Sequence, residues 1–418
     1  MTRLAVGLAA GRRALDVGPR GIAQRLAQRA YRSTGAADLL FNLDLDDILT
    51  DVASDLPVPP ARDDADGPLT VGWVATPPAP GSGGHTTVFR MVAALEARGH
   101  RCILFLYDKH GIDVERQTAV IRAHWPGVAA VVRDARDGIQ GVDVVIATGW
   151  ESAHVVVGYG LQPMHRLYFI QDFEPYFYGR GAEYELAAMT YDLPFRRIAL
   201  GEMVDAMIRQ ETGGASDVVP FGCDSAAYRL PADPAAKHGV AYFSRPGFAR
   251  RGHELACLAL RLFHRTHPDQ PVHVYGMPPR GLDIPHEFHG RLTTAELNDL
   301  YGRTIAGLAL SFTNITLVAE EMLAAGTIPI VNDMDAAHLV ISNPHVRWAR
   351  PTPAALAEAL GAAVDEPDIA GVAAAAAASV VGRSWQPTQD AFTRVVEETA
   401  FARIRGTKRE RAGEGELR

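Results

Sequence analysis

Short apolar runs alternate with segments of helical periodicity along most of the chain. The runs "LTVGWVA" at 69–75 and "RCILFLY" at 101–107 have the length and composition of buried strands. The segment between them carries apolar residues at the spacing of one helix face, namely Val88, Met91, Val92 and Leu95. Strands that alternate with helices predict a parallel sheet with helices on both of its faces.

The alternation falls into two series joined around residues 225–238. The first series predicts strands within 69–75, 101–107, 142–148 and 165–172, and the second within 239–245, 271–276, 305–311 and 327–332. In the second series Thr293 and Glu296 form a capping box that predicts a helix from residue 294. The fold class is therefore α/β, with two Rossmann-like, doubly wound domains at 67–226 and 227–382. Such domains bind ligands at the carboxyl ends of their strands and in the cleft between domains.

Residues 1–66 differ in composition and predict a helical extension followed by a linker. The segment 11–32 is Arg-rich and amphipathic, so it either lies on an anionic membrane surface or packs on the main body. The acidic "DLDD" at 44–47 is interpreted as a solvated face rather than a metal site. We expect residues 406–418 to be a disordered tail.

Composition narrows the class of protein. The 418 residues carry a net charge of −8, which argues against nucleic acid as a partner. The three cysteines are widely spaced and form neither a disulfide framework nor a zinc pattern. We expect no signal peptide and no membrane-spanning helix, and hence a cytoplasmic protein with peripheral association at the inner face of the plasma membrane as an option.

Glycines separate the first predicted strand from the helix that follows it. Gly81, Gly83 and Gly84 lie in "PAPGSGGHTTV", directly before His85. Such a loop exposes backbone N–H groups and the positive end of a helix dipole, which suits a phosphate. The spacing matches neither the dinucleotide fingerprint nor the P-loop. A phosphate site and a tight turn without a ligand both remain open here, and His85 could equally bind a ligand or cap the helix.

Arginines and carboxylates follow the strands of the second series. Arg245, Arg250 and Arg251 lie within seven residues between a strand and a helix, and arginine binds phosphate with fixed, bidentate donors. Further along, we expect residues 311–314 at a strand end and Glu320 and Glu321 at the opening of a helix. The two carboxylates could accept hydroxyls of a ribose or sugar, or merely favour the helix dipole.

Taken together, "GSGGHTTVFRMVAALEARGH", "YFSRPGFARRGHEL", "HGRLTTAELNDLYGRTIAGLALS" and "EEMLAAGTIPIV" resemble glycosyltransferase family 4, the retaining enzymes of the GT-B fold. "YFIQDFEPYFYGRGAEYELAAMTY" is similar to bacterial rhamnosyltransferases that use dTDP-rhamnose and build surface polysaccharides. The resemblance covers about residues 69–400, and it implies that residues 383–405 form a last helix that crosses back to the first domain.

The resemblance implies roles for individual residues on the donor side. Arg245 matches the arginine that binds the pyrophosphate, Arg251 or Arg250 takes the place of a lysine, and Glu321 matches the glutamate that binds the ribose. Thr313 stands where the family has another glutamate, so a charged role at that position is absent. The remaining donor contacts implied are Gly83, Gly84, Gly276, Asn314 and Leu317.

On the acceptor side the resemblance points to the stretch after the fourth strand. A histidine–aspartate pair of the family is altered here to Gln171 and Asp172. Carboxylates and aromatic rings suit sugar hydroxyls and sugar faces, although tyrosines here could equally serve packing. The acceptor-side candidates are His85, Trp150, Asp172, Glu174 and Tyr176, with Tyr178 and Tyr184 nearby.

The function implied is transfer of a deoxyhexose, rhamnose by the resemblance, from a dTDP-sugar to a glycan or glycolipid acceptor. We expect no metal and no cofactor, because no DxD-type pair follows a convincing strand. A non-catalytic sugar-nucleotide-binding or scaffold protein and a GT-B sugar-nucleotide epimerase are the alternatives.

Overall fold

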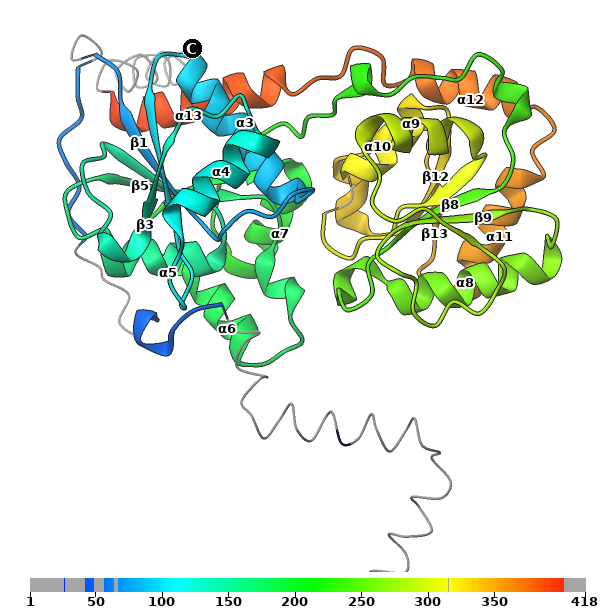
Figure 1. Cartoon of the computed structure of the whole chain (residues 1–418), viewed down its shortest axis with the longest axis horizontal. Helices are drawn as coiled ribbons and strands as arrows, with labels where there is room; N and C mark the ends of the chain where they lie inside the picture. The colour runs from blue at the N-terminus through cyan, green and yellow to red at the C-terminus, as the bar shows by residue number, and fades with distance from the viewer. Residues whose placement is uncertain (1–25, 27–41, 49–55, 64–66, 315, 402–418) are drawn as a thin grey trace, which may run out of the picture.

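The computed structural model describes residues 26, 42–48, 56–63, 67–314 and 316–401. Nearly all of the Arg-rich segment 11–32 and the tail 406–418 lie outside the described residues, so the expectations for them stay untested. The described part forms two α/β domains that lie next to each other (Figure 1). We call them the first and the second domain, after the two sheets on which they are built.

The first sheet has seven strands in the order β3-β2-β1-β4-β5-β6-β7, and all of its pairings are parallel. The strands are β1 (Thr70–Ala75), β2 (Arg101–Leu106), β3 (Val131–Asp134), β4 (Val144–Ala147), β5 (His165–Ile170), β6 (Arg196–Leu200) and β7 (Asp217–Val219). The helices of this domain are α3 (Gly83–Ala97), α4 (Val114–His124), α5 (Trp150–Tyr159), α6 (Ala182–Ala188) and α7 (Glu202–Thr212).

The second sheet has six parallel strands in the order β10-β9-β8-β11-β12-β13. They are β8 (Val240–Ser244), β9 (Val272–Gly276), β10 (Glu287–Phe288), β11 (Ala306–Leu308), β12 (Ile328–Asn332) and β13 (Arg347–Ala349). The helices that follow β7 in the chain are α8 (His253–Thr266), α9 (Thr294–Arg303), α10 (Thr316–Ala324), α11 (Pro353–Val364), α12 (Ile369–Ala378) and α13 (Gln386–Ala400). The α/β class with two Rossmann-like sheets is confirmed.

The strands that the sequence predicted correctly include those that are buried on both faces of a sheet. Every residue of β4 and β5 is buried, and the whole of β4 and the last four residues of β5 form unbroken apolar runs in the sequence. The capping box predicted at Thr293 and Glu296 is also present at the start of α9. The sequence analysis missed β3, β6, β7, β10 and β13, which are short, partly exposed or interrupted by charged residues.

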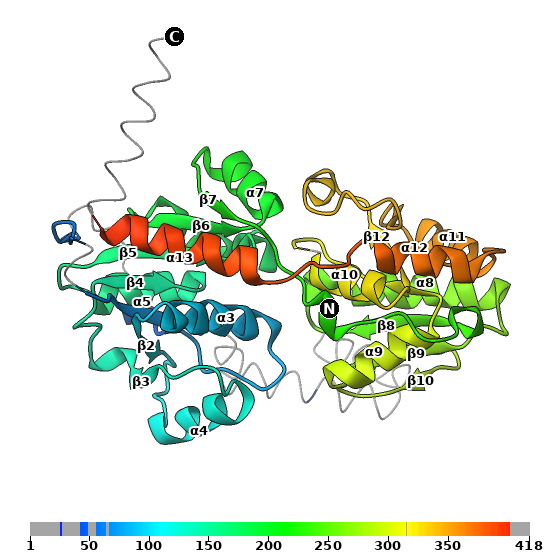
Figure 2. The same cartoon turned by 90° about the horizontal axis from the view of Figure 1, so that it is seen from above.

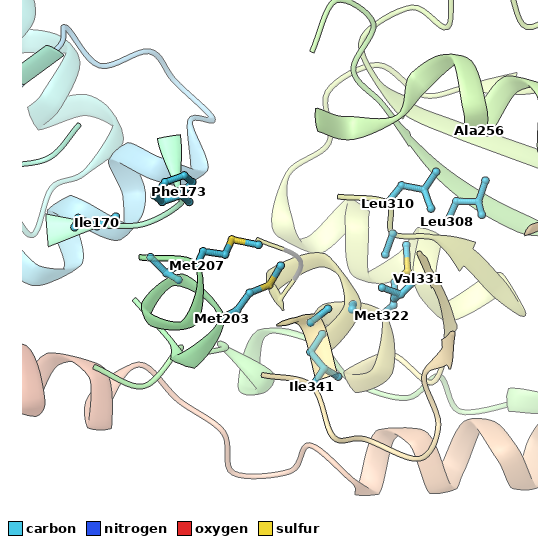
Figure 3. Packing of buried hydrophobic residues seen from close by; sticks show 14 of the residues in the cluster. Ile170, Phe173, Met203, Met207, Ala256, Leu308, Leu310, Met322, Val331 and Ile341 are labelled. Carbon is cyan, nitrogen blue, oxygen red and sulfur yellow. The ribbon is translucent and has the colours of Figure 1, made fainter. Parts of the chain in front are cut away.

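The two domains share one buried apolar cluster. Figure 3 shows Met203 and Met207 of α7 between Phe173 of the first domain and Met322 of the second. Helix α13 follows the second domain in the chain but packs on α3 and β7 of the first (Figure 2). Its Phe392 stacks on Trp73 of β1, with ring centroids 5.4 Å apart. The chain therefore passes between the domains twice.

Most of the acidic stretch 44–47 is exposed, as its composition predicts, but Asp47 is half-buried and makes two side-chain contacts. Asp47 accepts hydrogen bonds from the hydroxyls of Tyr107 and Tyr159, the latter at 2.7 Å. Leu43 beside this stretch is buried in the same cluster as the first sheet. The tyrosines come from positions 60 and 112 residues further along the chain, so the prediction could not anticipate them.

A buried lysine ties helix ends together in the second domain. The ammonium group of Lys237 donates to the carbonyl oxygens of Tyr301 at 2.9 Å, Thr304 at 3.1 Å and Ala325 at 3.0 Å. These carbonyls lie at the ends of α9 and α10, where helices leave acceptors unpaired. Lys237 is 4% exposed, so water does not replace it easily.

We expect Lys237→Met to lower the free energy of unfolding, because it removes a hydrogen-bond donor from three buried carbonyls. A loss of about 1–3 kcal/mol is typical of an unsatisfied buried polar group. Urea denaturation followed by circular dichroism measures it. The same substitution at the partly exposed Lys109 is the control, and equal effects of the two changes would contradict the assignment.

Candidate functional site

The carboxyl ends of β5 and β11 meet across the two domains. Gln171 and Asp172 directly follow β5, and Thr313 and Asn314 come five and six residues after β11. The Thr313 hydroxyl donates to Asp172 Oδ2 at 2.8 Å, and Asn314 Nδ2 donates to the backbone oxygen of Gln171 at 2.9 Å. Thr313, which stands where the resembled family has a glutamate, therefore contacts the first domain through a neutral hydroxyl.

Three arginines surround this contact. Arg245 follows β8, and Arg250 and Arg251 lie in a short 3-10 turn (Ala249–Arg251) before α8. Arg251 Nη1 donates to the Ser311 hydroxyl at 3.0 Å. The guanidinium of Arg250 lies 3.8 Å from the ring centre of Phe177 in the first domain. The guanidinium of Arg245 lies 4.4 Å from the ring centre of Phe248.

These arginines carry more positive charge than the described residues neutralise. No ion pair of Arg245, Arg250 or Arg251 with a carboxylate occurs within 4 Å in the described part of the chain. Burial, followed by the repulsion of Arg250, lowers the pKa of the Arg251 guanidinium to about 10. The Nε groups of Arg245 and Arg250 are buried without a hydrogen-bond partner. A bound anion would satisfy these donors.

Asp172 is the carboxylate that faces this charge. Its side chain is buried, and burial raises its pKa, while the nearby charges of Arg250 and Arg251 and the Thr313 hydroxyl act in the opposite direction. The same arginines thus attract a carboxylate of the first domain and remain available to a ligand.

The glycine loop at residues 81–84 leads into the start of helix α3. Gly81 has φ +78°, and α3 begins at Gly83 with Ser82 as its N-cap. A Cβ atom on Gly84 would lie 3.9 Å from the amide of Gln171, so the helix start approaches the carboxyl end of β5. The backbone there is open to a ligand, as a phosphate requires.

The side chain of His85 is engaged within the loop itself. Its Nε2 lies 3.0 Å from the carbonyl oxygen of Thr76, and its Nδ1 lies 2.8 Å from the Ser82 hydroxyl. A carbonyl only accepts, so Nε2 carries the proton and Nδ1 accepts from the serine. Burial lowers the pKa of His85, which keeps the ring neutral. Two roles were left open for His85, ligand binding and a contact at the start of the helix. These hydrogen bonds correspond to the second role.

A further buried carboxylate, that of Glu174, lies two residues after Asp172 in the chain. Glu174 accepts hydrogen bonds from the backbone N–H of Trp150 and from the Tyr168 hydroxyl, the latter at 2.7 Å. Burial, with the added repulsion of Glu151, raises the pKa of Glu174 to about 8. Trp150 is itself buried and donates from its indole to the Tyr178 hydroxyl at 3.1 Å. Glu174 therefore holds a proton at neutral pH.

The aromatic candidates Tyr176 and Tyr184 contact other residues of the first domain. The Tyr176 hydroxyl donates to Glu211 of α7 at 2.7 Å, and its ring packs edge-on against Phe173. Tyr184 is 9% exposed and lies under the guanidinium of Arg180, 4.5 Å from it. Packing accounts for both rings in this structure.

Glu320 and Glu321 lie in the second turn of α10, which starts at Thr316, and not at the opening of the helix. At this position the two carboxylates gain little from the helix dipole, because that effect falls off within the first turn. Glu320 is 1% exposed, and its Oε1 lies 2.6 Å from Nη1 of Arg383. The two neighbouring glutamates are thus not interchangeable.

Glu321 faces a different set of groups. Burial raises its pKa to about 7, opposed first by a hydrogen bond from the Tyr228 hydroxyl and then by the charge of Arg90. Tyr228 comes from the segment that joins the domains, and Arg90 comes from α3 of the first domain. The sequence analysis missed both residues, since neither lies in a recognisable motif.

Gly276 and Leu317 have clear packing roles. Gly276 has φ +97°, and a Cβ atom there would lie 2.7 Å from the backbone oxygen of Ser244, so only glycine fits at this strand end. Leu317 of α10 is half-buried against the apolar cluster of the first sheet. Neither contact tests a role in donor binding.

Comparisons with known proteins agree with this architecture. Residues 132–203 match the WsaF N-terminal domain, and residues 238–361 match the WsaF C-terminal domain. The O-antigen biosynthesis protein RfbC of Myxococcus xanthus is 28% identical over 336 residues, which cover 73% of this chain and 25% of that protein. The chain thus spans about a quarter of the length of this curated relative.

Solved structures share the fold at low identity. Anabaena Alr3699/HepE in complex with UDP-glucose matches with a TM-score of 0.63 and 14% identity, over 79% of this chain and 100% of that one. Sucrose-phosphate synthase from Thermosynechococcus elongatus matches with a TM-score of 0.61 and 15% identity, over 79% and 98%. The fold that these structures share with this chain is GT-B, with two Rossmann-like domains.

The raised pKa of Glu174 predicts a pH dependence of stability. The folded carboxyl keeps its proton up to about pH 8, whereas the unfolded one releases it near 4.5, so stability falls as the pH rises between these values. Glu174→Gln cannot ionise and should lose less stability over this window, by at least about 1 kcal/mol between pH 5.5 and 8.5. Urea unfolding at the two pH values measures the difference. The exposed Glu358→Gln is the control, and parallel profiles for wild type and Glu174→Gln would refute the prediction.

Proposed function

We propose that the chain is a retaining glycosyltransferase, similar to family 4, that moves a deoxyhexose from a nucleoside diphosphate sugar to a glycan or glycolipid acceptor. The observation that carries the proposal is the group of three arginines, Arg245, Arg250 and Arg251, at the carboxyl edge of the second sheet. They lie opposite the start of α3 and lack a paired carboxylate within the described residues. This arrangement suits a diphosphate bound between two domains.

In the proposed reaction the bond between the anomeric carbon and the β-phosphate oxygen breaks. Negative charge develops on the departing diphosphate, and the arginines and the N–H groups at Gly83 and Gly84 stabilise it. The acceptor hydroxyl oxygen forms the new bond to the anomeric carbon, and its proton passes to the departing phosphate oxygen. We propose that no metal takes part, because the guanidinium groups supply the positive charge.

The nature of the donor is inferred from several lines. The HepE structure was solved with UDP-glucose, which supports a nucleoside diphosphate sugar as the ligand class. The similarity of residues 168–191 to rhamnosyltransferases supports rhamnose carried by dTDP. The O-antigen relative supports a surface polysaccharide as the product.

Whether the protein associates with a membrane depends on the nature of its acceptor. Among the described residues, no helix is both long and apolar enough to span a membrane. Separately, we propose a cytoplasmic protein that associates peripherally with the inner leaflet, where it would meet a lipid-linked acceptor.

One observation favours a second candidate function. Thr313 occupies a position where the resembled family has a glutamate, and its hydroxyl holds Asp172. A protein that binds a sugar nucleotide without transferring it, as part of a polysaccharide assembly complex, accounts for this loss. Donor binding without transfer to any acceptor would favour this candidate.

The arginine assignment predicts the effect of single substitutions on nucleotide binding. Arg245→Ala and Arg251→Ala should each weaken dTDP or UDP binding by about 2–5 kcal/mol, the usual result of removing one partner of a buried charge pair. Isothermal titration calorimetry measures the dissociation constants. Arg265→Ala, at an exposed position of α8, is the control. Unchanged affinity in both variants would remove the arginines from the donor site.

Glu321 and Glu320 provide a matched pair. If Glu321 accepts the hydroxyls of the donor ribose, Glu321→Gln should weaken binding of the sugar nucleotide at least about tenfold, because charge-assisted hydrogen bonds are roughly twice as strong as neutral ones. Glu320→Gln loses the contact with Arg383 and should lower the melting temperature without changing donor affinity. Equal losses of affinity in the two variants would exclude the ribose assignment.

A further inference from the structure

A cluster of metal-ligand side chains lies at the outer edge of the second sheet. His273 is in β9, Glu287 is directly opposite it in the neighbouring strand β10, and His289 follows two residues after Glu287. Residues two apart in an extended segment point to the same face. The backbone continues the pairing past β10, because His289 donates its N–H to the oxygen of Val274 at 2.8 Å. The strands thus fix all three side chains.

The three side chains converge on one point. Nδ1 of His273 lies 3.1 Å from Nε2 of His289 and 3.2 Å from Oε2 of Glu287, and the last two atoms are 3.9 Å apart. Zn²⁺ binds histidine nitrogen and carboxylate oxygen at about 2.0–2.2 Å in tetrahedral geometry, which places neighbouring ligand atoms about 3.3 Å from each other. The separations observed here lie around that value.

We propose that His273, Glu287 and His289 form a binding site for a divalent transition metal of the zinc class, which fastens the edge strand β10 to β9. Two imidazoles and one carboxylate are a ligand set that Zn²⁺ accepts, with the fourth position left to water. The Glu287 side chain is 62% exposed, so the ion can enter from solvent, while that of His273 is 7% exposed and anchors the site from within.

Charged groups of both signs lie near the site. The exposed Arg303 at the end of α9 acts on both histidines and opposes a cation, whereas the Glu287 carboxylate attracts one. Burial lowers the pKa of both histidines, which leaves their rings neutral and free to bind metal near neutral pH. The competing arrangement is a hydrogen-bonded triad in which one imidazole N–H donates to its neighbours.

The site lies apart from the proposed donor site. His273 is the second residue of β9 and Gly276 is the last, so the cluster is about 10 Å short of the carboxyl edge at about 3.3 Å per residue. A metal here would stabilise the second domain and take no part in glycosyl transfer. The inference is therefore independent of the proposed function.

The test uses the full chain without a polyhistidine tag, treated with a chelator and then dialysed free of it. Added Zn²⁺ should raise the melting temperature, because an ion that binds only the folded state stabilises it. Co²⁺ should give the visible absorption bands of a tetrahedral site with histidine ligands. His289→Asn should abolish both responses, and Glu287→Gln should weaken Zn²⁺ binding about tenfold or more.

His286→Asn is the matched control, because His286 lies one residue before Glu287 and its Nδ1 is turned to the backbone oxygen of Ile284 at 2.8 Å. It should keep both responses. Nucleotide affinity should be the same with and without Zn²⁺. The proposal is overturned if Zn²⁺ leaves the melting temperature of the wild type unchanged, if saturation needs millimolar Zn²⁺, or if His289→Asn responds like the wild type. Any of these results would leave the hydrogen-bonded triad as the account of the cluster.

Discussion

The buried carboxylate of Asp172 lies near the guanidinium groups of Arg250 and Arg251 in the second domain. The arrangement of the site depends on the attraction between these charges. Taking Asp172, Arg250 and Arg251 out of water costs free energy, which their mutual attraction and the Thr313 hydroxyl offset in part. A bound diphosphate would draw on the same guanidinium groups. Domain contact and ligand binding therefore share one set of charges, so a change in either alters the other.

The central strands and the order of elements could be predicted from the sequence, because strands buried on both faces are mostly apolar. The strands at the edges of the sheets, and β6 next to one edge, could not. β6 begins with Arg196, whose guanidinium binds Asp217 of β7 at 2.6 Å, and these charges break the apolar pattern. β10 is only two residues long and is held largely by its neighbour. Tertiary pairing, rather than local composition, makes such segments into strands.

The candidate site was predictable only where its residues follow strands. The positions of Arg245, Arg250 and Arg251 follow from the rule that parallel sheets present ligands at their carboxyl ends. The pairing of Thr313 with Asp172 joins positions 141 residues apart, and no local pattern encodes it. The same applies to Glu320 and Glu321, which differ by one position but face Arg383 and Tyr228.

The two passages of the chain between the domains lie against each other. Ser225 in the first passage donates from its backbone N–H and its hydroxyl to the oxygen of Arg383 in the second, at 3.3 and 2.8 Å. Two peptide segments bonded side by side resist shear and twist more than one, so they act as a single pivot. If the second domain rotated about this pivot, the displacement at any point would grow with its distance from Ser225 and Arg383. A small rotation there would then give a larger change of spacing at the remote rim of the two sheets.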